Sequence, residues 1–365
     1  MLLGSALHTG GAERVMAHLV RNLDPARYRV TVCHLMNRGK IGDELADDGF
    51  DVVGVPRERR PLLRYLTYRN LQRVLAERRV DLIHTHSHYA VSDATLCRML
   101  TPQRFKLVHT FHFGNYPHIP RRYRWIEWAG TRAADRLVAV GVEQAKAVRA
   151  TYDLAAGRVG VIVNGAELGT GSVDPEWTRR LVGTGKVVIG TICTFIEQKG
   201  LPHLLQAAAR LKQQGVPATF VIVGDGHLRS SIEDRCRADG LADDVLFTGH
   251  VDRAAARVLP LFDIFFQPSL WEAMSMVIVE AMAAGKPVVA TDVGDNRHVV
   301  VDGATGYVVA KGDIAAMADA LARLVADPGQ RRSFGEAAVC RYREKYTVSS
   351  MVNSYDQLYS DLLMS

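Results

Sequence analysis

The sequence has few cysteines and no long hydrophobic run. None of its apolar stretches is long enough to cross a bilayer, and no signal peptide opens the chain. The five cysteines are far apart and form no Cys-x-x-Cys pair, which argues against a disulfide framework or a zinc ribbon. No internal repeat or low-complexity segment stands out. We therefore expect a cytoplasmic globular protein, and 365 residues predict two domains.

The charge is unevenly distributed along the chain. Residues 1–167 hold 25 lysines and arginines against 16 aspartates and glutamates, whereas the remainder holds 20 against 23. The first half is therefore the part expected to meet an anionic partner.

Residues 269–291 (SLWEAMSMVIVEAMAAGKPVVAT) carry two glutamates, Glu272 and Glu280, with seven residues between them. Residues 276–284 are apolar on nearly every face, which predicts a buried helix. Gly285 and Pro287 end this helix, and residues 287–290 predict a buried strand.

The start of this helix predicts an anion site, because the first backbone N–H groups of a helix have no internal partner and suit a phosphate or pyrophosphate. Glu272 would lie just before the site and Glu280 about two turns into the helix. A buried carboxylate needs a partner, and a ribose diol is one such partner. The alternative is a buried helix with one capping and one structural glutamate. The residues that would line the anion site are Ala273, Met274, Ser275, Met276 and Val277.

Residues 268–309 resemble the signature of the retaining glycosyltransferases of family 4. The resemblance implies the GT-B fold, in which two Rossmann-like parallel-sheet α/β domains face a deep interdomain cleft. In that family the first glutamate of the pair lies by the donor sugar and the second binds the nucleotide ribose, which assigns these roles to Glu272 and Glu280. Ala273 stands where the family usually has glycine.

Strand-like and helical patterns alternate through the chain and predict a parallel α/β fold. We expect a first domain over residues 1–167, a glycine-rich linker over 168–186 and a donor-binding domain over 187–346. The resemblance implies that residues 347–365 form a helix that crosses back to the first domain. The expected strands of the first domain span 1–6, 29–36, 51–56, 81–86, 106–112, 135–140 and 159–164, and those of the second begin at 187, 218, 245 and 263.

Other donor-binding residues follow from the resemblance. Gly10 and Gly11 precede a helix, where glycine lets the backbone approach an anion, and they match the family's donor-phosphate loop. The first strand is short for the family, which leaves open a native start upstream. Lys199 matches a lysine that grips the donor pyrophosphate, but Thr194 stands where a second cation, arginine, is usual. The remaining positions are Gly224 in a glycine turn and the backbone of His250 and Val251 beside the nucleotide base.

Five histidines cluster in the first half, at positions 84, 86, 88, 109 and 112. His84, His86 and His88 would share one face of a strand, so a metal is conceivable, although no carboxylate or cysteine spacing completes a site. Packed, hydrogen-bonded histidines are the alternative. Thr110-Phe111-His112 resembles a family segment whose histidine contacts the donor sugar, which implies that role for His112.

Two basic stretches, 57–79 and 116–128, mix arginines with leucines or aromatic residues. Such a helix can lie on an anionic membrane surface, which would make the protein peripheral on the inner face of the membrane. A surface helix with its apolar face on the core is the alternative. Nucleic acid is not expected, since no binding motif accompanies the charge.

The resemblance implies a retaining hexosyltransferase that uses a nucleotide-diphosphate sugar, with UDP or GDP as the nucleotide. It implies a hydroxyl acceptor on a glycan or lipid-linked glycan, in bacterial cell-surface polysaccharide, lipopolysaccharide or glycolipid synthesis. Glu272, His112 and Lys199 are the expected catalytic residues, with no metal or other cofactor, and no acceptor-binding residue is assigned. A non-catalytic sugar-nucleotide-binding homologue is the second hypothesis, because Thr194 removes a cation. A nicotinamide dehydrogenase would need Gly-x-Gly-x-x-Gly after the first strand, and the chain has only Gly10-Gly11 there.

Overall fold

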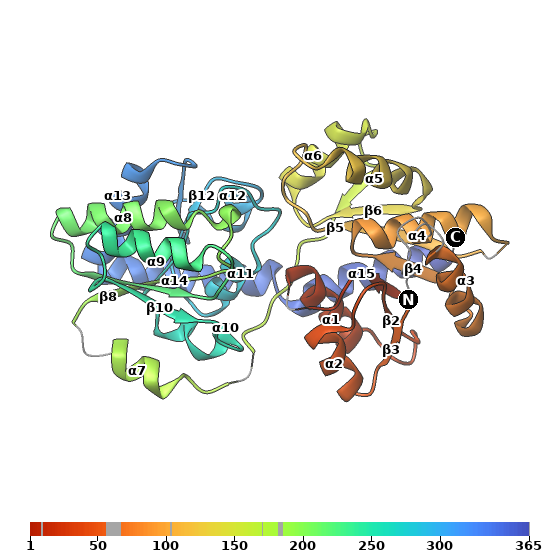
Figure 1. Cartoon of the computed structure of the whole chain (residues 1–365), viewed down its shortest axis with the longest axis horizontal. Helices are drawn as coiled ribbons and strands as arrows, with labels where there is room; N and C mark the ends of the chain where they lie inside the picture. The colour runs from red at the N-terminus through yellow and green to blue at the C-terminus, as the bar shows by residue number, and fades with distance from the viewer. Residues whose placement is uncertain (9, 56–66, 103, 170, 182–184, 365) are drawn as a thin grey trace. The chain divides into compact units, whose positions relative to one another are not determined.

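A computed structural model of the chain describes residues 1–8, 10–55, 67–102, 104–169, 171–181 and 185–364. The chain divides into two compact units. The first comprises Met1–Gly165 together with Val348–Ser365, and the second comprises Ala166–Thr347. Each unit is a parallel β-sheet with helices packed on it (Figure 1).

The first unit holds a seven-stranded parallel sheet in the order β3-β2-β1-β4-β5-β6-β7. Every strand lies within a segment that the sequence predicted, and each is one to four residues shorter than expected. The strands are β1 (Leu2–Gly4), β2 (Thr31–His34), β3 (Asp51–Gly54), β4 (Leu82–Thr85), β5 (Lys106–Phe111), β6 (Arg136–Ala139) and β7 (Val159–Val161).

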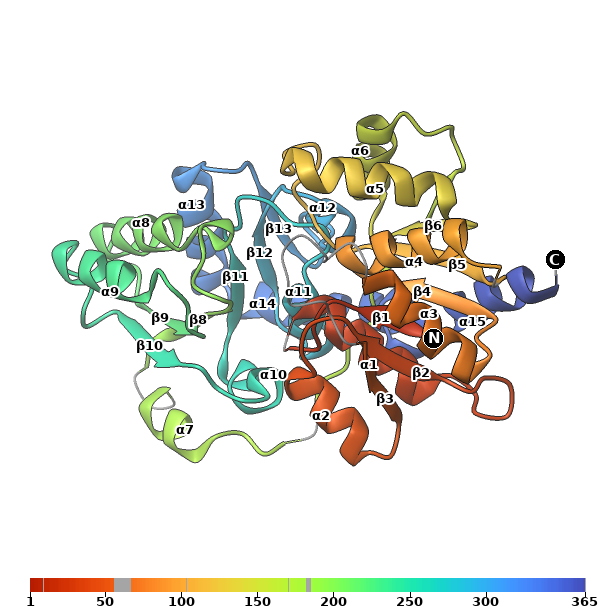
Figure 2. The same ribbon diagram turned by 45° about the vertical axis from the view of Figure 1, so that its right-hand side comes forward.

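Helices cover both faces of this sheet, because successive strand residues point to opposite sides. Leu3 packs in a core cluster with α3, α4 and α6, whereas its neighbour Leu2 packs with α1, α2 and α15. The fold is thus a three-layer α/β/α unit, whose helices can be followed in Figure 2. These helices are α1 (Gly11–Asn22), α2 (Gly39–Asp47), α3 (Thr67–Arg78), α4 (His88–Leu100), α5 (Arg121–Ala133), α6 (Val142–Tyr152) and α15 (Val348–Met364).

The second unit holds a six-stranded parallel sheet in the order β10-β9-β8-β11-β12-β13. Ile189, Phe220 and Ile264 on one face pack in a cluster with α8, α9 and α13, and Figure 1 shows α8 and α9 running along this sheet. The strands are β8 (Val187–Ile192), β9 (Ala218–Val223), β10 (Val245–Gly249), β11 (Ile264–Gln267), β12 (Val288–Thr291) and β13 (Gly306–Val309). The helices are α7 (Pro175–Leu181), α8 (Leu201–Gln213), α9 (Arg229–Ala238), α10 (Ala254–Arg257), α11 (Met276–Ala283), α12 (Asn296–Val299), α13 (Ile314–Ala326) and α14 (Pro328–Lys345), with 3₁₀ turns η2 (Glu197–Lys199) and η3 (Leu259–Leu261).

The helix predicted over 276–284 is confirmed as α11, and its end has a clear physical cause. The backbone N–H of Gly285 donates to the carbonyl of Met282 at 3.0 Å, and that of Lys286 donates to Ala281 at 2.9 Å. Gly285 has φ +67°, the left-handed conformation that this pair of bonds requires and that glycine adopts without strain.

The segment expected to be a linker, 168–186, is not wholly irregular, since α7 lies within it. Residues 170 and 182–184 of the segment lie outside the described residues. The final segment, expected to return to the first domain, is α15, whose Tyr355 and Tyr359 are buried in the first unit.

Candidate active site

The order of the second sheet reverses between β8 and β11, the kind of position at which open α/β sheets bind ligands. A hydrogen bond and a close backbone contact connect the loops that follow β8 and β11. The N–H of Leu270 donates to the carbonyl of Gln198 at 2.7 Å. Gly200 has φ +62°, and a Cβ there would lie 2.1 Å from the carbonyl oxygen of Pro268. The η2 turn, which carries Lys199, is therefore fixed against the loop before Glu272.

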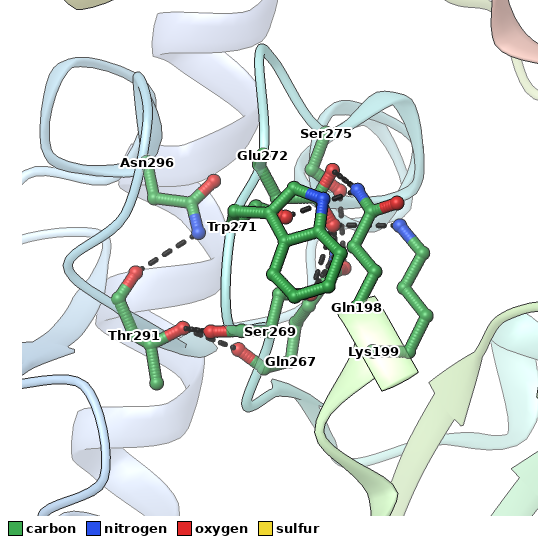
Figure 3. A network of polar contacts seen from close by, with 9 residues as sticks. All are labelled: Gln198, Lys199, Gln267, Ser269, Trp271, Glu272, Ser275, Thr291 and Asn296. Atoms are coloured by element: carbon green, nitrogen blue, oxygen red, sulfur yellow. Dashed lines mark hydrogen bonds and ion pairs between the residues drawn. The ribbon is translucent and has the colours of Figure 1, made fainter. Parts of the chain in front are cut away.

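The carboxylate of Glu272 is buried, with 6% of the residue exposed, and four side chains hold it (Figure 3). Its Oε1 accepts hydrogen bonds from Lys199 Nζ at 2.6 Å, Gln267 Nε2 at 2.9 Å and Ser269 Oγ at 2.8 Å. Its Oε2 accepts one from Gln198 Nε2 at 3.1 Å. A carboxylate has about four acceptor sites over its two oxygens, so Oε2 retains the unused capacity.

A further set of hydrogen bonds orients this network from behind. The hydroxyl of Ser275 donates to Gln267 Oε1 at 3.0 Å, which fixes the amide so that Nε2 faces Glu272. Thr291 Oγ1 donates to the carbonyl of Ser269 at 2.6 Å, and Asn296 Nδ2 donates to the carbonyl of Thr291 at 2.9 Å. Glu272 is therefore held in one orientation by residues at or just after the ends of β8, β11 and β12.

Sequence reasoning missed most of these supporting residues. Gln267, Ser269, Thr291 and Asn296 are all buried polar groups. A usable signal was present at Gln267, because a glutamine that ends an apolar strand must find a hydrogen-bond partner.

The residues predicted to form the anion site lie at the start of α11. Ala273, Met274 and Ser275 are buried, and α11 begins at Met276 with Ser275 as its N-cap. The Ser275 side chain makes no capping hydrogen bond, and its hydroxyl instead donates to Gln267. The first turn of α11, including Val277, is thus left without a side-chain cap.

Glu280 is buried, with 7% of the residue exposed, on the helix that follows Glu272. The expected position needs one correction. Because α11 begins at Met276, Glu280 lies little more than one turn from its start rather than two.

The other residues predicted to bind the nucleotide-sugar donor lie in different environments. Gly10 is the N-cap of α1 in an extended conformation, and it is exposed together with Gly11. Gly224 has φ +133°, and a Cβ there would lie 1.9 Å from the carbonyl oxygen of Cys193, so close packing alone requires this glycine. The side chains of Thr194 and His250 are exposed, and Val251 is half-buried.

In the first unit His84, His86 and His112 form one layer at the ends of β4 and β5, whereas His109 lies on the opposite face of the sheet, against Phe111. His84 shares hydrogen bonds with Tyr359 Oη at 2.6 Å and Thr110 Oγ1 at 2.7 Å. His86 Nδ1 lies 2.9 Å from His112 Nε2, and the two rings are stacked. The idea that His84, His86 and His88 share a strand face is wrong at His88, which begins α4.

Burial keeps the histidine layer neutral, and it does the same for His109 on the other face. Burial lowers the pKa of His112 to about 3 and that of His109 to about 4, and it lowers the pKa of His84 and His86 well below the usual value. In the described parts of the chain, no group of three or more histidines, cysteines, aspartates or glutamates is arranged to hold a metal ion.

Helix α5 contains part of the second basic stretch, for which the sequence left a membrane-facing and a core-facing helix open. Trp125 is 72% exposed and Trp128 43% exposed, so these two tryptophans face outward rather than toward the core, whereas Tyr123 of the same helix is half-buried against His88. Together with Arg121, Arg124, Thr151 and Tyr152 they line a surface pocket of about 370 Å³. Of the first basic stretch, residues 57–66 lie outside the described residues.

Solved structures with the same fold come from several glycosyltransferases. Anabaena HepE, crystallised with UDP and glucose, superposes with a TM-score of 0.84 over 99% of this chain and 100% of its own, at 20% identity. Sucrose-phosphate synthase from Thermosynechococcus elongatus superposes with a TM-score of 0.82 over 100% and 99% of the two chains, also at 20% identity. These likenesses place the fold in the GT-B class of glycosyltransferases.

Sequence comparison identifies the family. Residues 9–169 match the family model described as Glycosyltransferase Family 4, and residues 176–339 match that of Glycosyl transferases group 1. D-inositol 3-phosphate glycosyltransferase of Corynebacterium urealyticum is 30% identical over 305 residues, which are 76% of this chain and 72% of that protein. The putative glycosyltransferase EpsF of Bacillus subtilis is 25% identical over 96% of this chain and 94% of its own length. The protein belongs to this family of GT-B glycosyltransferases.

None of the helices in the described residues combines the length and hydrophobicity that crossing a bilayer requires.

Proposed function

We propose that the protein is a retaining hexosyltransferase that moves a sugar from a nucleotide-diphosphate sugar to a hydroxyl of a glycan or lipid-linked glycan. The observation that carries this proposal is the Glu272 carboxylate, which four donors hold directly ahead of the uncapped start of α11. Complexes of Anabaena HepE with UDP and with UDP-glucose support UDP as the nucleotide to test first, with GDP as the alternative.

Lys199 and the start of α11 would stabilise the leaving diphosphate. As the bond to the sugar breaks, negative charge grows on the diphosphate, and fixed donors aimed at that charge lower the barrier. The ammonium group of Lys199 has three N–H donors, of which the bond to Glu272 uses one. Lys199 can therefore keep its ion pair with Glu272 and still donate to a phosphate oxygen.

Glu272 would contact the sugar through Oε2, because Oε1 already accepts three hydrogen bonds. An anionic oxygen beside the sugar also favours the positive character that its ring gains during transfer. Glu280 would bind the ribose diol of the nucleotide, and His112 would contact the sugar.

A divalent metal is not required for this arrangement, since the lysine and the helix start supply the positive potential. Addition of EDTA to the assay tests that point: activity that survives chelation supports the proposal, and loss that Mg²⁺ restores contradicts it.

A panel of nucleotide-diphosphate sugars tests the function directly. A true donor should raise the melting temperature by mass action and should support transfer or slow hydrolysis. Glu197→Gln is a control variant that should behave as the wild type does. Glu197 lies in the same η2 turn as Lys199, but its side chain is 64% exposed. Stabilisation by a donor without any turnover would instead favour a non-catalytic homologue. Thr194, which stands where a second cation was expected, supports that alternative.

The outward face of α5 supports an anionic membrane surface as a partner and a lipid-linked acceptor in cell-surface glycan synthesis. Tryptophan and arginine on one exposed helix face suit the lipid headgroup region. Vesicles containing anionic lipid should therefore bind the protein in a salt-sensitive manner, and Trp125→Ala with Trp128→Ala should weaken the binding. Equal binding of this variant and the wild type would remove α5 from the interface.

A further inference from the structure

The histidine layer holds a hydrogen bond whose direction the surroundings determine. His86 Nδ1 and His112 Nε2 are 2.9 Å apart, and the ring planes differ by 19°. Burial lowers the pKa of both rings far below neutrality, so each carries a single N–H. One of the two facing nitrogens must therefore hold the shared proton and the other must accept it.

The far side of the His86 ring decides between the two directions. His86 Nε2 is buried and has no hydrogen-bond partner among the described residues. If His86 Nδ1 were the acceptor, the proton of this ring would sit on Nε2 as a buried, unpaired N–H group. Unpaired buried N–H groups are rarer in proteins than unpaired acceptors. The favoured arrangement therefore has His86 Nδ1–H as the donor and His112 Nε2 as the acceptor.

This direction fixes the proton of His112 on the opposite side of its ring. A neutral imidazole that accepts at Nε2 carries its hydrogen on Nδ1. Within the described chain no protein group bonds to His112 Nδ1, and this atom is absent from the set of buried unpaired atoms. The Nδ1–H group is thus free to donate to a ligand.

The orientation of His86 is itself held by the C-terminal helix. The His84 and His86 ring centroids are 4.0 Å apart. His84 in turn bonds to Tyr359 of α15 and to Thr110, whose hydroxyl lies 3.1 Å from Tyr355 Oη. Rotation of His86 away from His112 would therefore disturb a packed layer rather than a loose side chain.

We propose that His86 is a positioning residue that holds His112 as the Nδ1–H tautomer, so that His112 presents a hydrogen-bond donor, and not an acceptor, to the sugar. The ligand half of this statement rests on the proposed function. The tautomer half depends only on the first unit and can be tested without any substrate.

The test compares two variants of His86 in the full-length protein. The amide nitrogen of asparagine sits two bonds beyond Cβ, as Nδ1 does, so His86→Asn keeps a donor toward His112. His86→Leu keeps the bulk and loses the donor. Nitrogen-15 NMR of the histidine rings should show the Nδ1–H tautomer of His112 in the wild type and in His86→Asn, and a shift toward Nε2–H in His86→Leu. An Nε2–H tautomer in the wild type would overturn the proposal.

Transfer kinetics supply the second readout. His86→Leu should lower kcat about tenfold, the effect of one lost oriented hydrogen bond, with KM for the donor changed less than twofold. His86→Asn should restore most of kcat, and His227→Leu, at a 61% exposed histidine, should leave it unchanged. Equal loss in the Leu and Asn variants would show a packing role only and would contradict the proposal. If the wild type transfers no sugar from any donor, the proposed function fails, while the NMR result still decides the tautomer.

Discussion

The two sheets carry polar groups at the same kind of edge but keep them buried in different ways. In the second unit the buried Glu272 carboxylate is paired with Lys199 and hydrogen-bonded by three uncharged donors. In the first unit the histidines are uncharged, because burial lowers the pKa of His84, His86, His109 and His112 far below neutrality. These are the two physical solutions for a buried ionisable group: pairing it, or discharging it.

The two kinds of group suit different roles: the carboxylate–lysine pair can act through charge, and the neutral histidines can act through hydrogen bonds. A paired carboxylate and a lysine can act on charge that develops in a diphosphate and a sugar. Neutral histidines can orient hydroxyl groups without attracting or repelling that charge. If this division is right, removing charge from the second unit should affect turnover most, and acid should affect the first unit most.

Glu272→Ala removes the acceptor of four hydrogen bonds and should have the largest effect. Turnover should fall at least about 100-fold, the scale of a lost transition-state contact. Steady-state transfer measures the loss, and circular dichroism shows whether the fold persists. Glu272→Gln keeps the shape but places an amide against donors, so it should restore little activity. Near-normal turnover of either variant would take Glu272 out of the site.

Acid should destabilise the first unit before the second. An unfolded histidine binds a proton below about pH 6.5, whereas folded His109 resists protonation until its pKa of about 4. Between these values the unfolded state binds more protons, so stability is lost as pH falls. At about 1.4 kcal/mol per pH unit below pH 6.5, His109 alone accounts for about 2 kcal/mol at pH 5. When the pH is lowered from 7 to 5, hydrogen exchange should speed up more in β4 and β5 than in β8 and β11. A larger increase in β8 and β11 would contradict the comparison.

Glu280→Ala tests whether the buried carboxylate of α11 serves the nucleotide. We expect binding of the free nucleoside diphosphate to weaken about tenfold, the value of one hydrogen bond to a charged group. Isothermal calorimetry measures this change. Because Glu280 is buried, a melting curve without ligand is needed beside it. Unchanged affinity in a folded variant would leave Glu280 with a structural role.

Much of the fold could be predicted from the sequence because its signals are local. Strand–helix alternation predicted the parallel sheets, and Gly285 and Pro287 marked the end of α11. Lys199 and Glu272 were also predicted as site residues, from local motifs that resemble those of the family. Their mutual ion pair was not, because it depends on the close approach of the loops at Gly200 and Pro268.

Long-range packing accounts for what the sequence did not reveal. On α5 the sequence left open whether the apolar side faces a membrane surface or the core, and the residues that are buried are Glu127, Gly130 and Thr131. A Cβ at Gly130 would lie 2.6 Å from Val91 Cγ2, so only the small residues fit against α4. The pairing of His86 with His112 likewise joins the ends of two neighbouring strands.

The smallest expected effect comes from adding charge to the site rather than removing it. Thr194 lies after β8 in an exposed position where the family usually has arginine. Thr194→Arg should tighten binding of the nucleotide-diphosphate sugar by about threefold to fivefold, since an exposed guanidinium contributes less than about 1 kcal/mol. Titration at two salt concentrations should show the gain shrinking as ionic strength rises. Thr194→Gln, which adds a polar side chain without charge, should not reproduce it. If both variants bind the donor as the wild type does, Thr194 lies too far from the diphosphate for charge there to matter, and the positive potential of the site comes from Lys199 and α11.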